Sequence, residues 1–126
     1  MLEKKFRLRK RTEFAYSFKH GKTSFGQVVN VCVFGRKDKL LRIGFSVSKK
    51  VGGAVTRNRV RRQLQAIVRE KINEIERGFN LIFVARPEIE KLEFEDIKKA
   101  VLTQIKRAGV IQEDFKTEDG KLNDGK

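Results

Sequence analysis

The stretch from residue 48 to residue 62 carries the densest cationic chemistry of the chain. Six lysines and arginines surround a Gly52-Gly53 turn and the expected start of a helix. The first turn of a helix has unpaired N–H groups and a partial positive charge, so arginines there oppose the helix dipole and repel one another. A phosphate at this position would make both interactions favourable. The stretch therefore predicts a binding site for a polyanion.

Arginine suits phosphate because its planar guanidinium group makes bidentate hydrogen bonds, whereas lysine acts as a point charge. Glu70 is the only acid between Lys49 and Lys71, which disfavours the alternative of a solvated face of balanced ion pairs. Asn58 either caps the helix or hydrogen-bonds RNA. The residues expected to bind the polyanion are Lys49, Lys50, Arg57, Asn58, Arg59, Arg61, Arg62 and Arg69.

Groups that could catalyse a reaction on their own are scarce. His20 is the single histidine, and Cys32, the single cysteine, lies in an apolar run that predicts a buried small hydrophobe. One cysteine can build neither a disulfide framework nor a thiolate metal cage. The acids between residues 88 and 96 flank a helix start, where the dipole favours them. We therefore expect no catalytic residue and no metal ligand in this polypeptide.

A second candidate surface combines aromatic and polar side chains. Phe14 and Phe18 are four residues apart on an expected helix beside a basic arm. They either stack on the bases of a single strand or pin the helix to the sheet, and both interpretations are open. Alternation along a strand places Arg42, Ser46 and Ser48 on its polar face. A cleft between this face and the first helix is expected.

Length and charge limit the class of protein. A chain of 126 residues suits one domain with a real core, and a net charge of +14 favours nucleic acid or an anionic membrane as the partner. No run is long enough to span a bilayer and no signal peptide opens the chain, so a cytoplasmic protein is expected.

Hydrophobic periodicity predicts the elements that position these residues. Thr12 is expected to cap a first helix that ends near Gly21. Two strands, over residues 27–34 and 41–48, are expected to form an antiparallel hairpin. A third strand over residues 79–85 is nearly all apolar and should lie inside the sheet.

The longest helix should begin at Thr56 or a neighbour and stop at Gly78, with an apolar stripe that packs on the sheet. Helical spacing places Arg59, Arg62 and Arg69 of this helix on one exposed ridge.

A last helix is expected over residues 93–108, ended by Gly109. The predicted order of elements is helix, strand, strand, helix, strand, helix. A further short strand can follow the first two strands. This order predicts an α+β fold, built as a two-layer sandwich. We expect one RNA-binding domain over residues 1–111, with an irregular basic arm over residues 1–11, and a disordered polar tail over residues 112–126.

The sequence Arg-Asn-Arg-Val-Arg-Arg at 57–62, preceded by Ser-Val-Ser-Lys-Lys-Val-Gly at 46–52, resembles the signature of the bacterial ribonuclease P protein subunit. The likeness covers most of residues 6–108. It implies a fold like the second domain of ribosomal protein S5, with a left-handed βαβ crossover around the longest helix. Further residues that match are Leu8, Arg9, Phe14, Phe18, Gly21, Arg42, Ile43, Gly44, Ala54, Ala85 and Arg86.

The resemblance also implies a function. The protein would be an accessory subunit of ribonuclease P, the endoribonuclease that removes the 5′ leader from precursor tRNA. Its arginine-rich helix would bind the catalytic RNA, and Phe14 and Phe18 match the aromatics of a cleft that takes the single-stranded leader. The RNA would perform the Mg²⁺-dependent hydrolysis, so no protein ligand for Mg²⁺ is assigned. Catalytic RNA and precursor tRNA are the expected partners, with no membrane and no protein partner.

Three other classes of protein remain as alternatives. A structural protein of the ribosome would share the charge and would sediment with ribosomal subunits. A general DNA-binding protein would prefer duplex DNA and tolerate the loss of 2′-hydroxyls. A membrane-surface protein is disfavoured because the apolar stripes are needed for the core.

Overall fold

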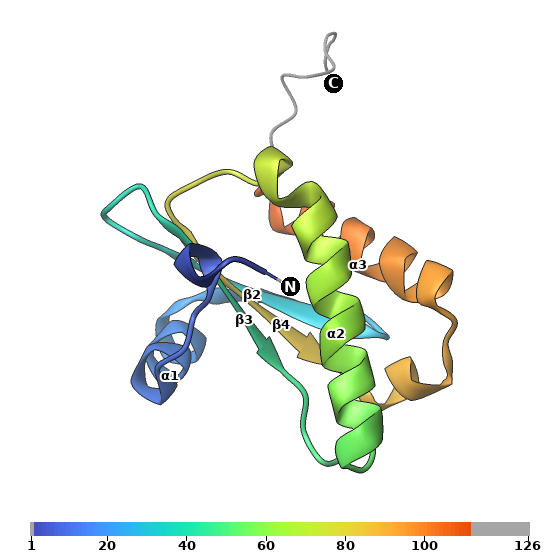
Figure 1. Cartoon of the computed structure of the whole chain (residues 1–126). Coiled ribbons are helices and arrows are strands. Elements are labelled where there is room, and N and C mark those ends of the chain that lie inside the picture. The colour runs from blue at the N-terminus through green and yellow to red at the C-terminus, as the bar shows by residue number, and fades with distance from the viewer. Residues whose placement is uncertain (1, 112–126) are drawn as a thin grey trace, which may run out of the picture.

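The computed structural model describes residues 2–111, so the expected tail over residues 112–126 lies outside the described part. Helices and one four-stranded sheet alternate along the chain (Figure 1). The α+β prediction is confirmed. The elements are η1 (Lys4–Phe6), α1 (Arg11–His20), β1 (Lys22–Ser24), β2 (Val29–Gly35), β3 (Leu41–Ser46), α2 (Ala54–Lys71), η2 (Ile72–Glu74), β4 (Phe79–Ala85), η3 (Pro87–Lys91) and α3 (Phe94–Ala108).

The strand order is β1-β2-β4-β3, so the expected hairpin of β2 and β3 is wrong. β4 lies between them, antiparallel to β2 and parallel to β3. Gly78, just before β4, accepts a hydrogen bond from Arg36 N (2.8 Å) and donates one to Leu40 O (2.8 Å), so it separates the two ends of the loop that joins β2 to β3. The apolar β4 thereby gains a partner on each edge. Its prediction as an interior strand is confirmed.

The unit β3–α2–β4 connects two neighbouring parallel strands through a helix. This is the βαβ connection that the resemblance implies, and its left-handedness stays a prediction. β1, the short additional strand, pairs with β2 and forms one edge of the sheet. The other edge is β3, where the basic arm is bound: Leu8 N donates to Ile43 O at 2.9 Å.

The arm is therefore more ordered than expected. It contains η1, and its Leu2 and Leu8 side chains are buried. The Arg7 side chain adds a hydrogen bond from Nε to Leu2 O at 2.8 Å. α1 follows directly and begins at Arg11, with Lys10 rather than Thr12 at its N-cap and no side-chain cap. Pairing of the arm with β3 thus sets where α1 begins.

α2 and α3 cover one face of the sheet and form the main core with it (Figure 1). The predicted apolar stripe of α2 is buried, but the α-helix begins after Gly53 and ends at Lys71, and η2 continues the chain. α3 ends as predicted, because Gly109 adopts a left-handed φ of 75°. The buried core residues of the two helices are Val60, Leu64, Ile67, Val68, Ile97, Val101 and Ile105.

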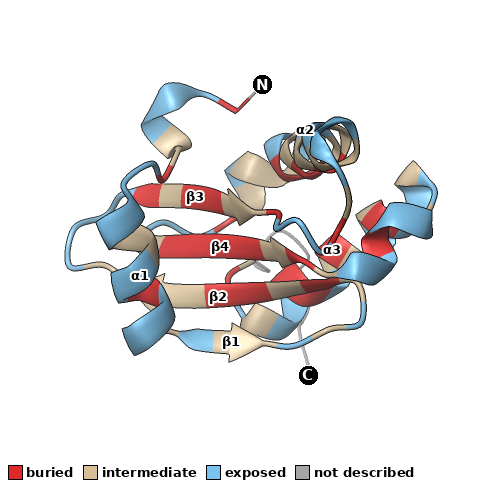
Figure 2. Ribbon diagram, turned by 90° about the horizontal axis from the view of Figure 1, so that it is seen from below, coloured by how far each residue is buried: buried red, intermediate tan, exposed pale blue. Residues whose placement is uncertain are grey.

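α1 packs on the opposite face, near the end at which β3 and β4 begin (Figure 2). A smaller cluster forms there from buried Leu8, Cys32 and Ile82, with half-buried Phe14 against them. The Phe14 ring lies so close to β3 that a Cβ on Gly44 would be 2.5 Å from Phe14 Cζ. Glycine at this position therefore lets α1 approach the sheet. α1 leaves part of this face uncovered.

Candidate nucleic-acid interface

The turn before α2 presents the positive end of that helix without an acidic cap. Gly53 is its N-cap, no side chain caps it, and no acid lies in its first turn. The preceding turn is held by hydrogen bonds from Val51 N to Ser48 O (3.0 Å) and from Gly52 N to Lys49 O (3.2 Å). Lys49 and Lys50 are exposed on this turn. The arrangement concentrates positive charge that an anion would neutralise.

The arginines of α2 lack acidic partners among the described residues. Within residues 2–111, neither Lys49, Lys50 nor any arginine from 57 to 69 is among the ion pairs formed within 4.0 Å. Asn58 accepts a hydrogen bond from Arg61 Nη1 at 3.2 Å, so it orients an arginine and does not cap the helix. Arg57 Nε is buried and has no hydrogen-bond partner within the described residues. The exposed side chains among them, those of Lys49, Lys50, Arg62 and Arg69, are available to phosphate oxygens.

The arginines of α2 occupy two flanks of the helix. Arg61 and Gln65 line a cavity of about 230 Å³ together with Arg9 and Phe14. On the other flank, Arg59 Nη2 donates to Glu90 O in η3 at 3.3 Å. Arg62 and Arg69 are exposed, as the predicted ridge requires. The positive surface therefore wraps around α2, and Arg9 and Gln65 are additions that sequence spacing could not reveal.

On the face of the sheet under α1, the residues predicted for the cleft are separated from one another. In β3, Arg42 and Ser46 lie two residues before and after Gly44, which Phe14 covers. Ser46 lies in register with Val84 of β4. The structure therefore does not bring Arg42 together with Ser46.

Beyond α1, one row of this face is formed by half-buried Ser46, Val84 and Asn30. Ser48 is exposed just past β3, where its Oγ accepts a hydrogen bond from Lys50 N at 3.3 Å. Ser46 and Ser48 thus lead from this row toward the turn before α2.

Arg42 instead belongs to the basic arm. It lines a cavity of about 410 Å³ whose other basic residues are Lys4, Lys5, Arg7, Arg9 and Lys10. Its Nε is buried and has no hydrogen-bond partner among the described residues. This basic cluster was not predicted as a site, although the run of cations in the arm was the signal for it.

The two aromatic side chains of the predicted cleft differ in exposure. Phe14 is half-buried in the cluster with Leu8, whereas Phe18 is 42% exposed. Tyr16, about 200° around the helix from Phe18, packs edge-on against Phe34 with ring centroids 5.3 Å apart. Phe18 therefore lies on the flank of α1 away from Tyr16. Phe14 packs in the core, while the Phe18 ring is available for stacking.

Cys32 is buried, as predicted, and its thiol donates a hydrogen bond to Ser17 O at 3.4 Å. Burial raises the pKa of this thiol, which keeps it protonated. Within residues 2–111, no three His, Cys, Asp or Glu side chains are grouped so that they could hold a metal ion. No helix in the same residues is long and apolar enough to cross a membrane.

Comparison with known proteins extends these observations. The family model for ribonuclease P matches residues 2–109. The ribonuclease P protein component of Clostridioides difficile is 38% identical over 104 residues, which cover 82% of this chain and 91% of the relative. That of Finegoldia magna is 36% identical over 107 residues, covering 85% of this chain and 94% of the relative.

Solved structures agree with these relatives. The Staphylococcus aureus RNase P protein superposes with a TM-score of 0.80 at 26% identity, covering 85% of this chain and 98% of that one. The Thermotoga maritima RNase P protein gives 0.74 at 28% identity, covering 80% and 96%. The matched span includes the sheet, α1, α2 with its uncompensated arginines, and α3. The chain therefore belongs to the ribonuclease P protein family.

Proposed function

We propose that this protein binds the catalytic RNA of ribonuclease P through the N-terminal half of α2 and holds the 5′ leader of precursor tRNA beside α1. The observation that carries the proposal is the group of cations at the start of α2, none of which forms an ion pair within residues 2–111. Uncompensated charge at a helix N-terminus is unfavourable in the free protein and becomes favourable against phosphates.

The catalytic RNA would contact the exposed cations of the turn and of α2. Arg62 and Arg69 are exposed, and Asn58 orients Arg61 by a hydrogen bond. Binding of this kind releases counterions, so the affinity should fall by about 0.7–0.9 log units per phosphate contact for each tenfold increase in salt. A protein that neutralises RNA in this way also lowers the Mg²⁺ concentration that the complex needs.

The leader would lie on the uncovered row of the sheet that Ser46, Val84 and Asn30 form. The exposed Phe18 ring on α1 supplies a surface on which a base can stack, and Phe14 supports α1 from beneath. Ser48 and Lys50 continue this path to α2, so leader and catalytic RNA would meet at the turn before the helix. Arg42 lies on the other side of Phe14 and is not part of this path.

The hydrolysis itself is assigned to the RNA. Cleavage of the phosphodiester uses Mg²⁺, and the described residues group no carboxylates into a cage for that ion. The polypeptide would act by charge neutralisation and by extending the contact with precursor tRNA beyond mature tRNA. It is an accessory subunit in the removal of the leader that gives the mature tRNA 5′ end.

The test compares two exposed phenylalanines in the reconstituted complex. Phe18→Ala should weaken binding of precursor tRNA by about 1–3 kcal/mol, the value of one stacked base, and leave mature tRNA unchanged. Phe25→Ala is the control, because Phe25 is 67% exposed and lies in the loop between β1 and β2. Equal losses for both tRNAs, or equal effects of both substitutions, would contradict the binding of the leader beside α1.

A further inference from the structure

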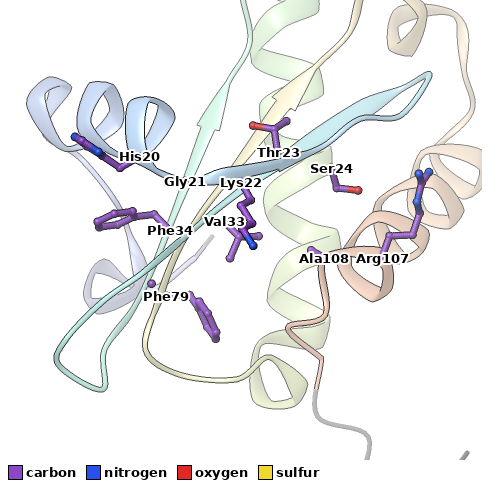
Figure 3. A pocket seen from close by; sticks show the side chains of 11 residues that line it. His20, Gly21, Lys22, Thr23, Ser24, Val33, Phe34, Phe79, Arg107 and Ala108 are labelled. Carbon is purple, nitrogen blue, oxygen red and sulfur yellow. The ribbon is translucent and has the colours of Figure 1, made fainter. Parts of the chain in front are cut away.

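A cavity of about 500 Å³ opens where α1 ends, β1 begins and α3 ends (Figure 3). None of its lining residues belongs to the surfaces assigned above to catalytic RNA or leader. Its volume lies within the range of small-molecule sites. The residues that carry the argument are Lys22, Val33, Phe79 and Arg107.

The walls of this cavity are apolar. Val33 of β2 and Phe79 of β4 are half-buried, and both side chains lie on the face of the sheet that α2 and α3 cover. Ala108 at the end of α3 closes the opposite side. Phe79 gives this wall an aromatic ring beside Val33, whereas the neighbouring Phe34 ring lies on the α1 side of the sheet, against Tyr16. An aromatic wall of this kind is suited to a nucleobase.

The rim is cationic. Lys22 of β1 and Arg107 of α3 are exposed, and no acidic residue lines the cavity. Figure 3 shows Lys22 extending beside Val33, with His20 and Arg107 at opposite ends of the cavity. Neither Lys22 nor Arg107 is in an ion pair within residues 2–111. Two unpaired cations beside an apolar wall favour a ligand that is planar at one end and anionic at the other.

We propose that this cavity binds one unpaired nucleotide of RNA, with its base against Val33 and Phe79 and its phosphate between Lys22 and Arg107. The naming of RNA as the source rests on the proposed function, whereas the nucleotide chemistry follows from the cavity alone. Bidentate hydrogen bonds from Arg107 and the charge of Lys22 suit a phosphate. The site is separate from α2, so the protein would contact RNA at a third place.

The test titrates the isolated protein with adenosine monophosphate as the probe, and amide NMR monitors the binding. The nucleotide should shift the signals of residues 20–24, 33–35, 79 and 107–108, and it should bind at least tenfold more tightly than adenosine or inorganic phosphate. Shifts confined to residues 47–62 would overturn the site. Equal affinity for inorganic phosphate would also overturn it, because the base would then contribute nothing.

A matched pair of double variants separates this site from general electrostatics. Lys22→Ala with Arg107→Ala removes two cations of the rim and should weaken the nucleotide at least tenfold. Lys19→Ala with Lys106→Ala removes the same charge from exposed positions outside the cavity, in the last turns of α1 and α3, and should change affinity less than twofold. All four positions are exposed, so both variants should keep the circular dichroism spectrum of the native fold. Equal losses in the two variants would refute the proposal.

A final arm identifies the source of the nucleotide. A single-stranded RNA of four nucleotides should displace adenosine monophosphate and lose at least tenfold in affinity when Lys22 and Arg107 are replaced. If the RNA fails to displace the nucleotide, RNA is overturned as the ligand. That failure is distinguishable from failure of the proposed function, because stimulation of cleavage by catalytic RNA is measured separately.

Discussion

Gly44 allows α1 to lie against the sheet, and adding one methyl group there should displace the Phe14 ring. In Gly44→Ala the new Cβ would be 2.5 Å from Phe14 Cζ and 2.7 Å from Cε1. Carbon atoms in ordinary contact are about 3.5–4.0 Å apart, so the ring must move by about 1 Å. Overpacking of this size costs about 1–3 kcal/mol of unfolding free energy.

The source of this cost can be isolated by removing the ring. In a Phe14→Ala background the nearest remaining side-chain atom is Leu8 Cβ at 3.4 Å, so Gly44→Ala should then be close to neutral. Alanine has less conformational entropy than glycine in the unfolded chain, and this difference would stabilise the protein by about 0.4–1 kcal/mol. The double-mutant cycle should therefore give a favourable coupling of about 1–3 kcal/mol between the two substitutions. Phe14→Ala alone destabilises, because it empties part of the cluster with Cys32 and Ile82.

The assay is equilibrium unfolding in urea, followed by circular dichroism. Gly35→Ala is the matched control, because it lies in the same sheet and a Cβ there meets no atom within 4 Å. This control should shift the midpoint little. Additive effects of Gly44→Ala and Phe14→Ala, within about 0.5 kcal/mol, would refute the packing of α1 described above.

Three further outcomes are expected. Replacing Arg59 and Arg62 by alanine should weaken binding to catalytic RNA and reduce the slope of log affinity against log salt by about 1.4–1.8, whereas removing two exposed lysines of α3 should leave the slope unchanged. The hydrogen bond from the Arg36 guanidinium lowers the pKa of Asp38 from 3.8 to about 2, so its contribution to stability is present above pH 3.8 and is lost as pH falls through about 2. An NMR titration of Asp38 with a midpoint near 3.8 would contradict this. Because Cys32 is buried and its pKa is raised, a thiol reagent should modify it in urea many times faster than in the native protein.

Local signals in the sequence predicted the elements well where the pattern is periodic. The strand Phe79–Ala85 and the helix end at Gly109 follow from an apolar run and a glycine stop, and both have those bounds in the structure. The pairing of the strands was predicted wrongly. Two strands joined by a short turn usually form a hairpin, and nothing local in the sequence distinguishes β2 and β3 from that common case. Long-range pairing places β4 between β2 and β3, and the hydrogen bonds of Gly78 to Arg36 and Leu40 are part of it.

The candidate site was also predicted only in part, because local spacing does not show which distant segments lie beside a helix or a strand. Spacing along α2 identified its arginines, but the division into two flanks depends on what lies beside the helix, namely the arm near Arg61 and η3 near Arg59. Alternation placed Arg42 and Ser46 on one face, yet it could not reveal that Phe14 lies between them. The order of the arm was missed because it comes from pairing with Ile43, far away in the sequence.

The central claim is that the polypeptide assists a catalytic RNA and does not cleave RNA itself. The most direct measurement is the cleavage of 5′-labelled precursor tRNA at low Mg²⁺ by bacterial catalytic RNA alone, by this protein alone, and by the two together. We predict cleavage at the mature 5′ end only when both are present. Cleavage by the protein alone, or no stimulation despite tight binding to the catalytic RNA, would contradict the claim.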